Sequence, residues 1–151
     1  MENVDDRLRE AARVGNEVEL KACLMHPKCN ILSKSKDGKT ALMWAAIHGH
    51  EDCLKMLLPK SDALSMDRNS WTALMWAASF KQVACVKLLL PLSAVMHTSV
   101  DNKTAGGHAR FAGHHKLAEL IDAYARAMSE KEGLQSCTDP GVPRQASAIR
   151  V

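Results

Sequence analysis

The apolar residues of this chain form short clusters that return at a regular interval. Residues 40–46 read TALMWAA, and residues 72–78 repeat the same seven letters. The leucine and the last two alanines of this heptapeptide stand at positions i, i+3 and i+4, which share one face of a helix. A second apolar cluster follows each copy, reading EDCLKMLLP and VACVKLLLP. The pattern therefore predicts helical hairpins that recur along the chain and stack into an array.

Two further copies extend the array on either side. The segment DNKTAGGHARFAGHHKLAELID, which begins at Asp101, continues the 32-residue spacing of the two heptapeptides. Upstream, LREAARVGN from Leu8 matches LMWAAIHGH from Leu42 at an offset of 34 residues. We therefore expect one repeat domain over residues 1–126, with units at approximately 1–34, 35–66, 67–98 and 99–126.

Each unit also carries start and stop signals for its helices. An Asp- or Asn-containing turn precedes a threonine, a residue type that caps helix N-termini by accepting a backbone hydrogen bond. Glycine is typical after a first helix, and proline ends a second one. We expect N-caps at Thr40, Thr72 and Thr104, C-caps at Gly49 and Gly113, and helix ends at Pro59 and Pro91. Neither helix can bury its apolar face alone, so the units must stack.

These residues resemble the ankyrin repeat family, whose consensus runs D-x-x-G-x-T-P-L-H-x-A-A-x-x-G-H before a leucine-rich second helix. The resemblance covers residues 4–126 and implies an all-α solenoid of stacked helix-turn-helix units with short hairpin-like loops. In the second unit it rests on Thr40, Leu42, Ala45, Ala46, Gly49, His50, Leu57 and Leu58. TALM replaces TPLH, so Met43 and Met75 cannot make the hydrogen bonds of the family's histidine.

The last unit and the end of the chain depart from the pattern. Gly106 and Gly107 replace the Leu-Met of the earlier helices, and a glycine inside a helix costs about 1 kcal/mol relative to alanine. We expect this unit to unfold first. Residues 127–151 lose the periodicity and gather Pro, Gly and Ser, which predicts a flexible tail. An R-x-x-S arrangement at residues 144–147 and a Φ-x-Φ ending leave a phosphorylation site or a PDZ-type ligand open.

Composition and charge narrow the function classes. The formal net charge of +3 is small, and the basic residues are interspersed with acidic ones, which argues against nucleic acid or an anionic membrane as a partner. The charged N-terminus lacks the apolar core of a signal peptide, and the five cysteines are odd in number without C-x-x-C spacing. These features predict a monomeric protein with reduced thiols in the cytoplasm, with the nucleus as the alternative compartment.

Signatures of chemistry are missing from the sequence. There is no G-x-S-x-G, no Walker sequence and no H-E-x-x-H, so we expect neither an enzyme nor a cofactor. Cys53 and Cys85 share one repeat position that Leu117 fills with a plain hydrophobe, which favours core packing over metal binding. The alternative is a metal-binding or enzymatic protein that uses groups of the last repeat, namely His108, His114 and His115 with Cys85.

The aromatic residues suggest a binding surface. Trp44 and Trp76 share one first-helix position, Phe80 and Phe111 fall four and three residues beyond that position in their own units, and Trp71 precedes Thr72 in a loop. The ankyrin resemblance implies that the loops and first helices line a concave groove. The predicted protein-binding residues are Trp71, Phe80, Phe111, Ile47, His48, Trp44 and Trp76, with core packing favoured for Trp44 and Trp76. The predicted function is a non-catalytic protein–protein interaction module acting as a scaffold, an adaptor or a small inhibitor.

Overall fold

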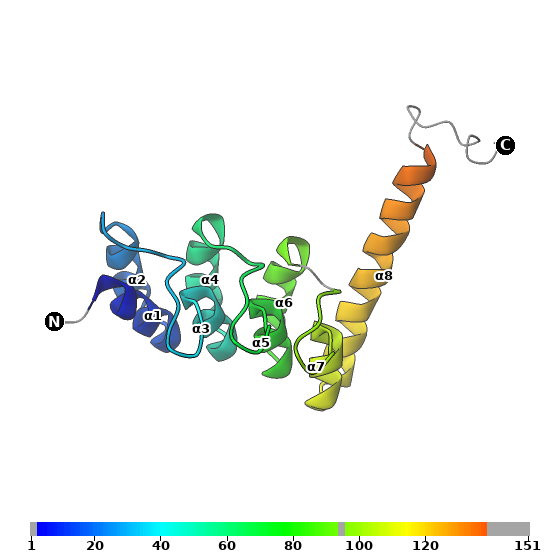
Figure 1. The fold of residues 1–151 in the computed structure, drawn as a ribbon, viewed down its shortest axis with the longest axis horizontal. Coiled ribbons are helices and arrows are strands. Elements are labelled where there is room, and N and C mark those ends of the chain that lie inside the picture. The colour runs from blue at the N-terminus through cyan, green and yellow to red at the C-terminus, as the bar shows by residue number, and fades with distance from the viewer. Residues whose placement is uncertain (1–2, 94–95, 139–151) are drawn as a thin grey trace.

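The computed structural model describes residues 3–93 and 96–138. Within these ranges the chain forms eight α-helices and two 3-10 helices and contains no strand, which confirms the predicted all-α class. The helices pair into four units that stand in a row from the N-terminus to the C-terminus (Figure 1). They are α1 (Val4–Val14), α2 (Glu17–Leu24), α3 (Ala41–His48), α4 (Glu51–Leu57), α5 (Ala73–Ser79), α6 (Val83–Leu89), α7 (Ala105–Phe111) and α8 (His115–Thr138).

Threonine caps begin three of the first helices, as predicted. Thr40 Oγ1 and Thr72 Oγ1 accept hydrogen bonds from the backbone N–H groups three residues later, each at 3.4 Å, and Thr104 Oγ1 does so at 3.2 Å. Each bond satisfies one of the amides that a helix N-terminus leaves without a partner. At the other end, Gly49 caps α3 with a left-handed φ of 71°. Gly113 adopts φ 90° one residue beyond the α7 cap, so the predicted stop is displaced by one position.

The loops before the first helices are hairpin-like and connect the units. Ser35, Asp67 and Ser99 donate their backbone N–H groups to the carbonyl four residues later, at 2.9, 3.0 and 3.0 Å. The intervening turn needs a positive φ, which Gly38 adopts at 84°. Neighbouring loops are joined because Val100 N donates to Asn69 O at 3.1 Å. The loops therefore stack in register with the helices behind them.

Small side chains explain how the units pack. The buried alanines of α3 and α5 let successive first helices approach closely, whereas the second helices α2, α4 and α6 make fewer contacts with one another. An array that is tighter along its first helices bends toward them. Leucines from both layers fill the space between, and Leu20, Leu42, Leu54, Leu57, Leu74 and Leu89 are all fully buried.

Polar side chains at the starts of the second helices tie each unit to the one before it. The ring nitrogen Nε2 of His50 lies 3.0 Å from the carbonyl oxygen of Arg13. Gln82 Nε2 donates to Ile47 O at 3.1 Å, and His114 Nε2 lies 3.2 Å from Ser79 O. A carbonyl oxygen only accepts, so both histidines carry a proton on Nε2. The Gly-His pair of the repeat therefore has a structural role here.

The C-terminal helix is longer than the sequence predicted. α8 continues to Thr138, past residue 126, where the repeat pattern ends, and it extends beyond the row of second helices (Figure 1). Residues 127–138, which the sequence predicted as part of a flexible tail, are therefore helical. Alanine, methionine, glutamate and lysine are strong helix formers, and a helix already nucleated by packing propagates through them. The predicted R-x-x-S site and the C-terminal Φ-x-Φ pattern lie outside the described residues.

Candidate protein-binding surface

A column of aromatic rings and a lysine runs across the first-helix face, the surface formed by α3, α5 and α7 with the loops before them. The ammonium nitrogen of Lys39 lies 5.6 Å from the ring centroid of Trp44 and 4.9 Å from that of Trp76. Both distances are within the range of a cation–π contact. Lys39 comes from the loop of the second unit, so its side chain connects the second and third units.

Trp71 repeats this arrangement one unit further along. Its ring centroid lies 4.4 Å from that of Trp76 and 4.0 Å from that of His108. Lys39 and Trp71 occupy the same repeat position, as do Trp44, Trp76 and His108. The loop residue of one unit therefore packs between the first-helix residues of its own unit and the next. Trp71 is only half-buried, but its ring is part of this column.

Hydrogen bonds from the loops fix two rings of the column. Asp67 is only 8% exposed, and its carboxylate accepts from the N–H groups of Asn69 and Trp71 at 2.8 and 3.0 Å. The same carboxylate accepts from Trp76 Nε1 at 3.0 Å. In the next unit, Ser99 Oγ and His108 Nε2 are hydrogen-bonded at 2.9 Å. These bonds satisfy buried polar groups and orient the rings.

Two phenylalanines of the first-helix face project into solvent. Phe80, which follows α5, is 50% exposed, and its ring stacks on that of Trp76 with centroids 6.1 Å apart. Phe111, at the end of α7, is 82% exposed and lies under Lys103, whose ammonium nitrogen is 5.1 Å from the ring centroid. Large exposed aromatic rings beside cations are typical of binding surfaces. Phe80 and Phe111 therefore meet the requirement of accessibility.

The other predicted residues are placed less uniformly. Ile47 is only 8% exposed, so its predicted position on an exposed strip is wrong. His48 is exposed, and its ring stacks on Trp44 with centroids 6.1 Å apart. Trp44 and Trp76 are half-buried, which places them between the core and the surface.

The residues of the metal-site alternative are dispersed. The His108 ring is hydrogen-bonded to Ser99 and packs at a tilt against Trp71, and the His114 ring is hydrogen-bonded to Ser79 O. Cys85 lies in the core, where burial, with a smaller effect from the Glu51 carboxylate, raises the pKa of its thiol to about 11. A thiol must lose its proton to bind a metal. Among residues 3–93 and 96–138, no group of three or more His, Cys, Asp or Glu is placed to hold a metal ion.

Sequence reasoning missed two residues of the column, Lys39 and Asp67. Alignment of the repeat units could have identified both residues. Lys39 aligns with Trp71 and Lys103, and Asp67 is the acidic member of a position that is serine in the units on either side. The side chains between the rings, and not the rings alone, connect the units.

The described residues together define a repeat protein built from stacked helix pairs. A family model described as ankyrin repeats (3 copies) matches residues 8–101, and the chain belongs to the ankyrin repeat family. Ankyrin repeats are protein–protein interaction modules, so this class of function follows from membership. Within the part of the chain that the structure describes, no helix is both long enough and apolar enough to cross a bilayer.

Curated relatives cover only part of the chain. Osteoclast-stimulating factor 1 of Danio rerio is 40% identical over 57 residues, which are 38% of this chain and 26% of that protein. The Bos taurus protein of the same name is 41% identical over 56 residues, or 37% of this chain and 26% of that protein. The matched region is thus about a quarter of these relatives' length.

Proposed function

We propose that this protein is a non-catalytic interaction module that binds a protein partner through the first-helix face, as a scaffold, an adaptor or a small inhibitor. The observation that carries the proposal is the exposure of two phenylalanines on the first-helix face: Phe80, which stacks on the ring column, and Phe111, which lies at the end of α7. A rigid aromatic anchor loses little conformational entropy when it is covered, which makes it an efficient contact. The cytoplasm remains the expected compartment, and a monomer the expected state.

The anchors divide into two kinds. Phe80 and Phe111 are accessible and can insert into a partner. The three tryptophans are half-buried and pack beneath this surface, namely Trp44, Trp71 and Trp76. Replacing Trp71 removes one of the side-chain contacts between the third and fourth units, so it would weaken that interface as well as change the surface. The informative variant is therefore Phe80→Ala with Phe111→Ala.

Affinity capture from an extract of the source cells tests this proposal. Removing a central aromatic anchor costs on the order of 2 kcal/mol in binding, or roughly thirtyfold in affinity, so we expect the double variant to lose the captured proteins. The matched control is Val18→Ala with Leu92→Ala, which removes exposed apolar side chains away from the first-helix face. Both variants should melt close to the wild type. Equal capture by the phenylalanine variant and the wild type would refute the assignment.

A further inference from the structure

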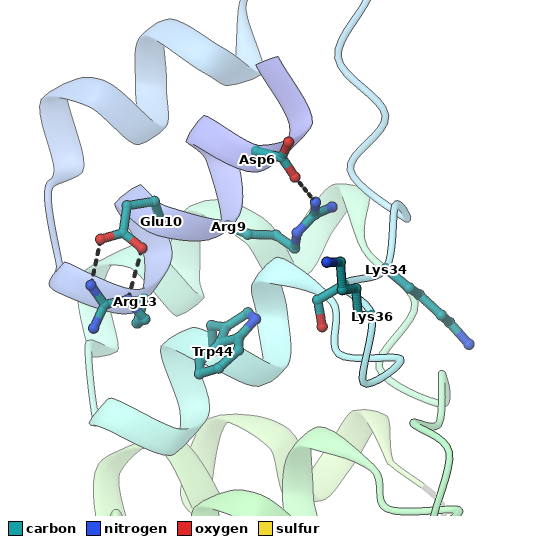
Figure 2. Close-up of a pocket in the computed structure, with 8 residues that line it drawn as sticks. Asp6, Arg9, Glu10, Arg13, Lys34, Lys36 and Trp44 are labelled. Atoms are coloured by element: carbon teal, nitrogen blue, oxygen red, sulfur yellow. Dashed lines mark hydrogen bonds and ion pairs between the residues drawn. The ribbon is translucent and has the colours of Figure 1, made fainter. Parts of the chain in front are cut away.

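A hollow of about 350 Å³ lies at the N-terminal end of the first-helix face, between α1, the loop at residues 34–36 and α3. Figure 2 shows Trp44 at one side, with Arg9 and Arg13 reaching toward the opening from α1. The volume is at the lower end of the range for ligand pockets and suits one or two amino-acid side chains. The hollow brings together two units, so neither unit forms it alone.

Both arginines of the hollow are held in place by carboxylates of their own helix. Arg9 is ion-paired with Asp6 and also donates from Nη1 to Ser33 Oγ at 2.7 Å. Arg13 is ion-paired with Glu10, and its Nε donates to that carboxylate at 2.7 Å. The hydrogen bond from Arg13 holds the pKa of Glu10 below its usual range, so the Glu10 carboxylate stays anionic at neutral pH. In each pair the two charges cancel, and the ion pairs hold both arginines in place at the edge of the hollow.

The remaining cations decide the charge of the hollow. Lys34 points away from Trp44 in Figure 2, because its ammonium group donates to Met66 O at 2.8 Å. Lys36 is exposed, and among the described residues it has neither an ion-pair partner nor a hydrogen-bond partner for its side chain. Both lysine charges are without a carboxylate partner in the described part of the chain, but Lys34 is already bound to Met66 O, so Lys36 is the ammonium group that is available to a ligand.

Trp44 supplies an apolar wall of the hollow and an indole N–H group that is available to an acceptor. Its ring is half-buried and is held by His48 and Lys39 on the side of the column. Unlike Trp76, whose indole N–H is bound to Asp67, Trp44 has no hydrogen-bond partner for its indole N–H among the described residues. An acceptor that enters the hollow would find this N–H group as well as the Lys36 ammonium.

We infer that this hollow receives a glutamate or aspartate side chain of the partner peptide, with its carboxylate at Lys36 and Trp44. The inference rests on the proposed function, because it assigns the charge of a segment that binds the same face. A single carboxylate matches the one ammonium group, that of Lys36, which has no partner among the described residues. The partner segment therefore carries its acidic residue at the N-terminal end of the first-helix face, and its apolar residues lie further along that face, at Phe80 and Phe111.

Degenerate peptide libraries with one fixed central residue test the inference. Libraries fixed as Glu, Gln or phosphoserine are passed over the immobilised full chain, and retention is compared for the wild type and Lys36→Glu. We expect the wild type to retain the Glu library about fivefold better than the Gln library. The preference should weaken as salt is added and should disappear in Lys36→Glu. The matched control is Lys87→Glu, which makes the same charge change at an exposed position of α6 and should keep the preference.

Every other result counts against the inference. Equal retention of the Glu and Gln libraries, a preference that survives Lys36→Glu, stronger retention of phosphoserine, or no retention of any library would each overturn it. The same libraries on Phe80→Ala/Phe111→Ala separate the two proposals. Wild-type retention by that variant, with the Glu preference intact, would refute binding at the phenylalanines and leave the acidic-residue pocket standing.

Discussion

At the scale of single residues, equivalent repeat positions are chemically different but geometrically alike. Ser35, Asp67 and Ser99 occupy one position, and the last two each hold a ring of the next helix through a side-chain hydrogen bond. His108 replaces the tryptophan of the two preceding units and is only 4% exposed. The exchange introduces a group that can take up a proton into an otherwise aromatic column.

The titration of His108 should make stability depend on pH. Burial, with a smaller effect from Lys103, holds its pKa below the usual range, while Asp101 acts in the opposite direction. Below about pH 6.5 the unfolded chain binds a proton at this ring more readily than the folded chain does. The free energy of unfolding therefore decreases as the pH falls through the pKa of the folded state. We expect the melting temperature to drop less between about pH 7.5 and pH 5 in His108→Asn than in the wild type.

The control for this measurement is His115→Gln, at the exposed start of α8. Other histidines contribute to the total slope, since burial also lowers the pKa of His48. The difference between the wild type and His108→Asn therefore isolates the buried ring. Identical pH dependence in the two proteins would show that the ring is protonated as easily in the fold as in the unfolded chain.

At the scale of elements, the two glycines of α7 are not equivalent. A side chain at Gly106 would overlap the Asp122 carboxylate of α8, which is ion-paired with Arg110. At Gly107, an added Cβ would lie 3.3 Å from the Cβ of Lys103, which belongs to a loop that can shift slightly. Gly106 therefore allows α7 and α8 to pack closely, and only Gly107 is a simple departure from the repeat.

Alanine substitutions should separate the two glycines. We expect Gly107→Ala to stabilise the protein by up to about 1 kcal/mol, the difference in helix propensity between the two residues. Gly106→Ala should give less than this or destabilise, because it displaces Asp122 from Arg110. Urea unfolding at equilibrium measures both. Equal stabilisation by the two variants would show that Asp122 moves aside without loss, and that both glycines only weaken the helix.

At the scale of the whole molecule, stability should vary along the array. The middle units contact a neighbour on both sides, whereas α7 and α8 pack against the third unit alone. In a repeat array the free energy of each unit includes its interfaces, so a terminal unit opens more readily. We expect amides of residues 104–126 to exchange at least about tenfold faster than those of residues 40–90, a difference of about 1.4 kcal/mol in opening free energy.

Hydrogen exchange followed by mass spectrometry gives this comparison in one experiment. Helices α3 and α5 are the internal reference, because they have equivalent sequences and each lies between two neighbours. The long α8 acts against fraying, since it buries Leu117, Ala118 and Ile121 on α7 and the third unit. Uniform protection over all four units would mean that α8 replaces the missing neighbour.

Short-range interactions, which depend on neighbouring residues alone, set the local structure of the array. Thr40, Thr72 and Thr104 cap helices because a threonine oxygen reaches the amide three residues later, whatever surrounds it. The turns and the prolines act over equally short distances: α4 and α6 end at Leu57 and Leu89, and each is followed by a 3-10 turn that contains the proline. Repeat register then predicted the number of units, because each unit must bury its apolar face on the next.

The contacts between units, by contrast, follow from the folded arrangement of the helices. The burial of Ile47 and the exposure of Phe111, which occupy the same repeat position, differ because a following unit covers the first and not the second. Lys39 faces two tryptophans, and the hollow at Trp44 joins α1 to a loop of the next unit. These features depend on the distances between side chains of separate units and on the directions in which those side chains point. The pattern of residues along the sequence specifies neither quantity.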